Sequence, residues 1–190
     1  MNRGRIVGIL FFLLLITSCK SDPVPRPQGY FRIDFPEKKY VRYNTDCPVS
    51  FEYPVYAQIE KIKSGEVNSC WYNISVAEYK AKIHLTYRPL NNKLSTYSED
   101  IRSIVYKHTQ MADDIQEFRI IDNKRHVFGI IYRISGNTAS SLSFYVTDSI
   151  NHFLSGALYF SAEPNKDSLA PAIKFFAEDV VHLTESVNWE

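Results

Sequence analysis

The strongest constraint on the fold is a strict two-residue alternation of side chains from Lys80 to Arg88. The odd-numbered positions, from Ala81 to Tyr87, are apolar or aromatic, whereas the even-numbered positions are polar. This pattern predicts a strand with one buried face that ends at Pro89. Other runs rich in β-branched and aromatic residues predict further strands at residues 49–56, 57–63, 70–76, 115–121, 126–135, 140–147 and 152–161.

The segment that follows this strand has helical spacing instead. A helix is predicted to begin at Ser95 or Ser98, either of which can cap it. Glu99 and Asp100 are expected near the positive pole of its dipole. The residues of its apolar stripe are Tyr97, Ile101, Ile104, Val105, His108 and Ala112.

A second helix is predicted near the carboxyl end of the chain. It is expected to start near Ser168, to accommodate Pro171 in its first turn, and to run to about Val187. Its apolar stripe consists of Leu169, Ile173, Phe176, Val180, Leu183 and Val187.

This order of elements predicts an α+β fold, with a mainly antiparallel sheet flanked by two amphipathic helices. Short polar links such as Gly136-Asn137 are typical of hairpins, so successive strands are expected to be antiparallel. Each helix must cover its apolar stripe with a sheet face, which gives a layered sandwich. The pattern resembles the sandwiches of the Mog1 and photosystem P-protein (PsbP) type, and this analogy of fold implies no function.

The first residues have the pattern of an export signal. Two arginines precede an apolar run from Ile6 to Ile16 that only Gly8 interrupts. A helix of this length reaches about 17 Å, too short for a hydrocarbon core of about 30 Å. The sequence 16–19, Ile-Thr-Ser-Cys, resembles a lipobox, which implies cleavage before Cys19 and acylation of that cysteine. The alternative is an ordinary signal peptide followed by an incidental cysteine.

We therefore expect three parts: a lipoprotein signal peptide at 1–18, an acylated cysteine with a proline-rich tether at 19–29, and a single globular α+β domain at 30–190. The alternating prolines of the tether favour an extended chain of about 30 Å. Loss of Arg3 and Arg5 with the signal leaves 20 of the 22 basic residues against 21 acidic ones. A nearly neutral domain gives no electrostatic reason to expect a nucleic-acid partner.

The three cysteines are consistent with export. If Cys19 carries lipid, Cys47 and Cys70 remain as an even pair in an oxidising compartment, and we predict a disulfide between them. A bridge closing about 24 residues would stabilise the fold by roughly 3 kcal/mol. The alternative is two buried free thiols.

The sequence contains no signature of an enzyme. The five histidines form none of the usual metal-binding spacings, and no serine lies in a nucleophile elbow. We expect no catalytic residue, no metal and no cofactor, although a site assembled from scattered residues stays open. His108 and His182 are expected at the edge of the core, and His84 is expected to be solvated.

Several long motifs resemble one family. They are Pro27–Tyr40 (PQGYFRIDFPEKKY), Cys47–Pro54 (CPVSFEYP), Cys70–Ile74 (CWYNI), Lys80–Tyr87 (KAKIHLTY), Tyr97–Arg102 (YSEDIR) and Tyr106–His108 (YKH). Together they resemble the gliding-motility lipoprotein GldD of the Bacteroidetes, over essentially the whole chain. The resemblance implies a lipoprotein required for gliding and linked to type IX secretion, with lipid at Cys19 and a paired Cys47 and Cys70. It implies no catalytic residue.

Two further expectations depend on this phylum. Surface-directed lipoproteins there carry an acidic run after the acylated cysteine, whereas only Asp22 follows Cys19 closely, which favours an anchor facing the periplasm. The tripeptides 148–150 and 167–169 look like the Asp-Ser-aliphatic acceptor of periplasmic O-glycosylation. Ser149, in a predicted turn, is the better candidate, because Ser168 is equally explained by helix capping.

Two functions follow as hypotheses. The first is a membrane-anchored, non-catalytic accessory protein with a protein partner in the gliding and secretion apparatus. Its candidate contact residues are Tyr30, Phe31 and Phe35, unless these aromatics simply dock on the domain's own core. The second is a periplasmic module that binds or processes a small ligand or glycan, in a groove lined by Trp71 and Tyr72.

Overall fold

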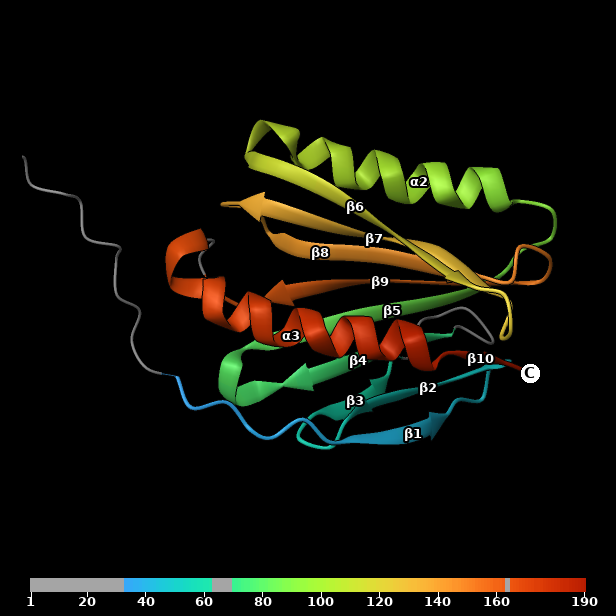
Figure 1. Ribbon diagram of the computed structural model, residues 1–190, viewed down its shortest axis with the longest axis horizontal. Helices are drawn as coiled ribbons and strands as arrows, with labels where there is room; N and C mark the ends of the chain where they lie inside the picture. Colours follow the sequence, from blue (N-terminus) through green and yellow to red (C-terminus); the bar gives the residue numbers. More distant parts are fainter. Residues whose placement is uncertain (1–32, 63–69, 163–164) are drawn as a thin grey trace, which may run out of the picture.

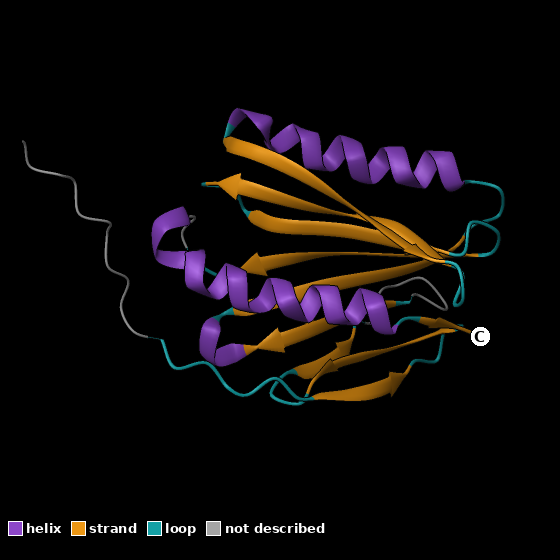
Figure 2. Ribbon diagram, in the orientation of Figure 1, coloured by secondary structure: helices purple, strands orange, loops and turns teal. Residues whose placement is uncertain are grey.

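The computed structural model describes residues 33–62, 70–162 and 165–190 of the chain. It contains two antiparallel sheets and two long helices (Figures 1 and 2). The strands are β1 (Tyr40–Asn44), β2 (Val49–Pro54), β3 (Gln58–Lys61), β4 (Trp71–Val76), β5 (Ala81–Pro89), β6 (Ala112–Asp122), β7 (Val127–Gly136), β8 (Ser140–Thr147), β9 (His152–Phe160) and β10 (Asn188–Trp189). The helices are α2 (Leu94–Tyr106) and α3 (Lys166–Ser186), with 3-10 turns η1 (Ala77–Tyr79) and η2 (Lys107–Gln110).

The larger sheet has seven strands in the order β3-β4-β5-β9-β8-β7-β6, and the smaller sheet has the order β1-β2-β10. Every pair of neighbours is antiparallel. Each of the eight predicted strands overlaps an observed one, because their alternation places one side-chain face in a core. The strands β1 and β10 were not predicted.

The helix α3 contacts β2 of the small sheet and β8 and β9 of the large sheet, and it contributes to the main core. Phe176, Val180 and Leu183 are almost completely buried, together with Phe51 of β2 and Phe144 of β8. The predicted stripe of this helix is therefore the face that it buries. Because β2 also contacts this helix, α3 helps to hold the small sheet against the large one.

The helix α2 covers the opposite face of the large sheet. Its Val105 packs with Tyr132 and Ile134 of β7 in a second cluster, whereas Ile131 of the same strand belongs to the main core. Since neighbouring residues in a strand point to opposite faces, the two helices lie on opposite sides of the sheet. The predicted class, a mainly antiparallel sheet flanked by two helices, is confirmed.

The predicted start of the first helix is wrong. The helix begins at Leu94, its N-cap residue Lys93 makes no side-chain capping bond, and the hydroxyl of Ser98 donates to the carbonyl of Ser95 inside the helix. Its first turn contains no acidic residue. Ile104, assigned to the stripe, is 50% exposed. The helix ends at Tyr106, so the predicted stripe residues beyond it lie in η2 and at the start of β6.

The second helix begins two residues before its predicted start. The side chain of Asn165 accepts hydrogen bonds from the backbone N–H groups of Asp167 and Ser168, both at 3.1 Å. Asparagine is among the best N-cap residues. Because Asn165 caps this helix, Ser168 is not its N-cap residue. Pro171 consequently lies in the second turn rather than the first.

Candidate functional site

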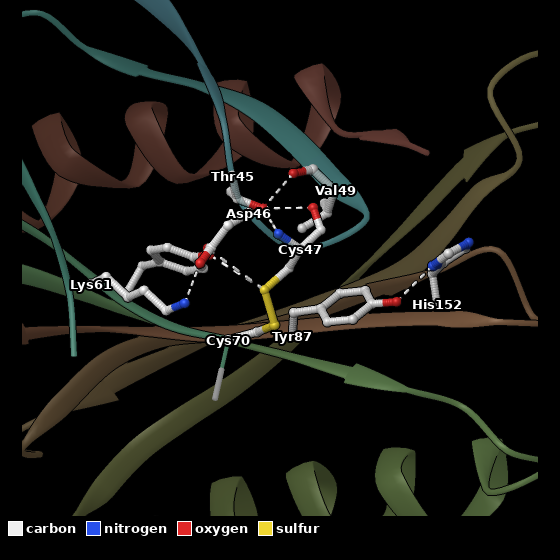
Figure 3. Close-up of a disulfide and its surroundings, with 9 residues drawn as sticks. Thr45, Asp46, Cys47, Val49, Lys61, Cys70, Tyr87 and His152 are labelled. Carbon is white, nitrogen blue, oxygen red and sulfur yellow. Dashed lines mark hydrogen bonds and ion pairs between the residues drawn. A yellow bond between two sulfur atoms is a disulfide. The ribbon is translucent and has the colours of Figure 1, made fainter. Parts of the chain in front are cut away.

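The structure describes some of the site residues that were predicted from the sequence and not others. Cys19, Tyr30 and Phe31 lie outside the described residues. Cys47 and Cys70 are joined by a disulfide, with their Cα atoms 6.2 Å apart (Figure 3). Cys47 lies two residues before β2 and Cys70 lies immediately before β4, so the bond links the small sheet to the large one.

Polar contacts surround this disulfide. The hydroxyl of Tyr72 donates to the carboxylate of Asp46, which also pairs with Lys61. Burial, and then the bond to Asp46, raises the pKa of Tyr72 well above its usual value. Tyr72 is buried in the core, and Trp71 on the opposite face is half-exposed, so the two side chains do not line a common groove as the ligand-binding hypothesis required.

Phe35 packs on the domain itself. Its ring stacks on Phe175 of α3 with centroids 4.3 Å apart and lies against Tyr79 at 5.3 Å. The hydroxyl of Tyr79 also donates to the carbonyl of Asp34 at 2.9 Å. Residues 33–39 form no strand, and the ring makes the intramolecular contact that was the alternative to partner binding.

Next to Phe35, a polar cluster fixes the same segment to α3. We call it the Asp179 network: Lys38, Tyr40, Tyr56 and Asp179. The ammonium of Lys38 donates to Asp179 Oδ1 at 2.6 Å and to the carbonyl of Phe175 at 2.8 Å. The hydroxyls of Tyr40 and Tyr56 donate to the two carboxylate oxygens at 2.9 and 2.7 Å.

The side chain of Asp179 is 0% exposed, so its charge depends on these donors. Burial first, and the Asp179 carboxylate second, raise the pKa values of Tyr40 and Tyr56 far above the usual range, so both hydroxyls stay protonated as donors. The network was not predicted. The only signal in the sequence was an acid beside the apolar stripe of a helix, directly before Val180.

A second polar contact joins β2 to the same helix. The ring of His182 donates to Glu52 Oε2 at 2.8 Å, and Arg42 donates to Glu52 Oε1 at 3.1 Å. The bond from His182, followed by that from Arg42, lowers the pKa of Glu52 below its usual value. The His182 ring also stacks on Tyr40 at 3.6 Å, so this edge of the core is continuous with the Asp179 network.

A groove of about 840 Å³ lies between α3 and the end of β7. We call it the α3 groove. Both apolar and charged side chains of α3 line its helix wall, Tyr40 also contributes, and β7 supplies part of the opposite wall. The lining includes Ala170, Ile173, Ala177 and Val181 from the helix and Arg133 and Ser135 from the strand. Its volume lies in the range of small-molecule sites, and its apolar wall could accept an aliphatic group.

The remaining predicted residues are distributed over the surface. Ser149 is exposed in the turn between β8 and β9, with a φ of 68°, and Asp148 accepts three backbone N–H bonds that close the turn. His84 is partly buried rather than solvated, because its ring contacts Asn73 and Tyr159. Burial lowers the pKa of His84.

Within the described ranges, no group of three or more histidine, cysteine or acidic side chains is arranged to hold a metal ion. No helix in that part of the chain combines the length and the apolar character needed to cross a membrane.

Comparisons with known proteins give likenesses of structure and of family. The solution structure of cyanobacterial PsbP (CyanoP) from Synechocystis sp. PCC 6803 is similar at a TM-score of 0.49 and 10% identity, over 89% of this chain and 100% of that chain. No curated protein matches the chain. The model of the family described as Gliding motility lipoprotein GldD matches residues 20–189. This match confirms the resemblance seen in the motifs, and the chain belongs to the gliding motility lipoprotein GldD family.

Proposed function

We propose that this protein is a non-catalytic accessory lipoprotein that supports the gliding and type IX secretion machinery through a protein partner. Membership of a gliding motility lipoprotein family supports the association with the cell envelope. The observation that carries the proposal is the Asp179 network, in which the segment leading from the tether is clamped on α3. Such a clamp fixes, on the surface of the domain, the point from which the tether leads to the membrane.

The polar contacts of this region support a structural rather than a catalytic role. The Asp179 carboxylate accepts bonds from three donors, and Glu52 accepts bonds from His182 and Arg42. A general base needs an accessible lone pair next to a substrate. Here the carboxylate of Asp179 is buried and engaged by its own fold.

The proposed anchor is acylated Cys19, facing the periplasm. Two or three acyl chains, at about 0.8 kcal/mol per buried methylene, would hold the domain on a bilayer almost permanently. The proline-rich tether would let it reach about 30 Å from the membrane.

Deletion of the gene followed by complementation tests this proposal. Wild type is expected to restore cell spreading and adhesin secretion, whereas Cys19→Ala is expected to stay at the level of the deletion strain, because it cannot be acylated. Ser18→Ala keeps a small residue before the cysteine and is the matched control, expected to behave as wild type. Normal gliding and secretion in the deletion strain would contradict the proposed function.

The second candidate function, small-ligand binding, is favoured by the α3 groove alone. Its alanine, isoleucine and valine side chains suit an aliphatic group, and Lys174, Glu178 and Arg133 add charged groups that could orient a polar end of the same ligand. Under this alternative, native mass spectrometry of the full chain purified from membranes is expected to show a bound small molecule. Ala170→Trp would narrow the groove and lower its occupancy, and Asp100→Asn, at an exposed position on α2 that does not line the groove, is the control. Unliganded protein alone would argue for the accessory role.

A further inference from the structure

The strand β6 is the terminal strand of the large sheet. It is eleven residues long and, among the strands that the structure describes, pairs only with β7, so its other side presents backbone N–H and C=O groups to its surroundings (Figure 1). Long edge strands of this kind are templates for another strand, and proteins commonly blunt them with proline or lysine. This strand contains neither, and its irregularity is confined to its first residues, between Ala112 and Asp114.

Large apolar side chains remain exposed along this edge. Phe118 is 44% exposed and Ile121 is 69% exposed. The pairing with β7 places Phe118 opposite Ile131 of the main core, and Ile121 opposite Phe128. The two exposed side chains therefore lie on opposite faces of the same edge, and water contact with each is unfavourable.

We propose that β6 pairs with β6 of a second copy of this chain, antiparallel, about a two-fold axis at Phe118. The chain would thereby continue its seven-stranded sheet across the axis into the sheet of the second copy. In this register, the residue numbers of opposed positions add up to 236, so every residue faces a partner on the same side of the sheet.

Most side chains of β6 are complementary to themselves in this register, and the exception is Gln116, which would lie opposite Ile120. Glu117 lies opposite Arg119 of the second copy, and the two-fold axis generates this pair of opposite charges twice. On the same face, Ile115 lies opposite Ile121, again twice. At the axis, Phe118 meets its own equivalent. Opposite charges and apolar pairs placed directly across neighbouring strands stabilise a sheet, whereas like charges there destabilise it.

The contacts that Glu117 and Phe118 already make within their own chain are compatible with these pairs across the two-fold axis. Glu117 Oε1 accepts a bond from the hydroxyl of Tyr106 at 3.0 Å, and a carboxylate can accept further bonds. Arg133 lies 5.1 Å from the centroid of the Phe118 ring, on the side of the neighbouring strand β7. A partner for this edge would thus need one glutamate, one arginine and three apolar side chains. The strand β6 of a second copy supplies all of them.

The charges at the ends of the strand limit the pairing to residues 115–121. Asp114 would lie opposite Asp122, which is unfavourable. Asp122 is turned toward its own hairpin, where it pairs with Arg125 at 2.8 Å and accepts the N–H groups of Lys124 and Arg125. Seven residues on each side give an interface smaller than stable dimers usually have, so the association is weak in dilute solution. Two copies held on one membrane would meet at a much higher effective concentration.

Cysteine cross-linking of the full chain in cell envelopes tests this register. With a copper–phenanthroline oxidant, Phe118→Cys is expected to give a covalent dimer on a non-reducing gel, because opposed Cα atoms of an antiparallel pair lie about 4.5–5.5 Å apart, within disulfide range. Ile115→Cys and Ile121→Cys are matched controls, since each would lie about 20 Å from its own equivalent. Expressed together on distinguishable copies, these two variants are expected to cross-link with each other.

Charge reversal provides a second test that does not depend on the aromatic ring. In the Phe118→Cys background, Glu117→Arg is expected to lower the dimer fraction by about tenfold. The new arginine would lie opposite Arg119 of the other copy, and the two-fold axis generates this repulsive pair twice. The double variant Glu117→Arg/Arg119→Glu is expected to restore pairing with itself and to reject wild-type charges. Equal cross-linking at positions 115, 118 and 121, cross-linking of position 118 to a different protein only, or no effect of charge reversal would overturn the proposal.

Discussion

Replacing Asp179 with alanine is expected to lower the free energy of unfolding by about 3–5 kcal/mol, because it leaves a partly buried ammonium without its carboxylate. Lys38 keeps only the Phe175 carbonyl and the Tyr56 hydroxyl as acceptors, and its ammonium is 3.3 Å from the Phe175 ring centroid. Two tyrosine hydroxyls also lose their acceptor. Denaturant unfolding of the full chain, followed by circular dichroism, measures the change.

The neighbouring Glu178→Ala is the matched control. Glu178 is an exposed acid on the same helix, so its removal is expected to change the stability by no more than about 0.5 kcal/mol. Asp179→Asn keeps an oxygen acceptor but no charge and should fall between the two. A stability of Asp179→Ala within about 1 kcal/mol of wild type would show that the network contributes little.

The same variant is expected to release the segment before β1. Residues 33–39 form no strand and are held by the Phe35 stack and by Lys38. Limited proteolysis of Asp179→Ala should therefore cut near residues 36–39 faster than in wild type, under conditions where the rest of the chain stays folded. Equal cleavage rates would contradict a clamp on this segment.

Removing the disulfide with Cys47→Ala/Cys70→Ala is expected to destabilise the protein by about 3 kcal/mol. The bond joins two residues that are 23 positions apart in the sequence, and its loss lets the unfolded chain sample more conformations. It also removes a covalent cross-link between the small and large sheets, which otherwise meet through noncovalent contacts such as that of Tyr43 with Tyr72 and through the chain between β2 and β3. Thermal unfolding of the double variant and the wild type gives the difference.

Reductant provides the control for this prediction. Wild type with dithiothreitol should approach the stability of the double variant, whose own stability should not change. In the oxidised wild type, neither cysteine should react with an alkylating reagent until the protein is unfolded and reduced. Alkylation of Cys47 and Cys70 without reductant would contradict the bond.

The elements with one buried face were predictable, whereas β1 and β10, at the margins of the small sheet, were not. The strand β5 alternates strictly because only its odd-numbered side chains enter the core, and the stripe of α3 is spaced as a buried helix face must be. The strand β1 was missed because it is an edge strand, so most of its side chains meet solvent and carry no alternation. The capping residues of both helices were not predicted, because a cap depends on a single residue rather than on a repeated pattern.

The sequence by itself determined the periodicity of each buried element, the cysteines available for pairing and the family, because each of these is written in residues close together in the chain or in the order of its motifs. Only the tertiary structure decided that Lys38 meets Asp179 across 141 positions, that Phe35 packs on α3, and that β6 forms the outer edge of the sheet. The reason is physical: contacts between distant residues depend on how the packed elements close long loops, and local side-chain patterns contain no record of that closure.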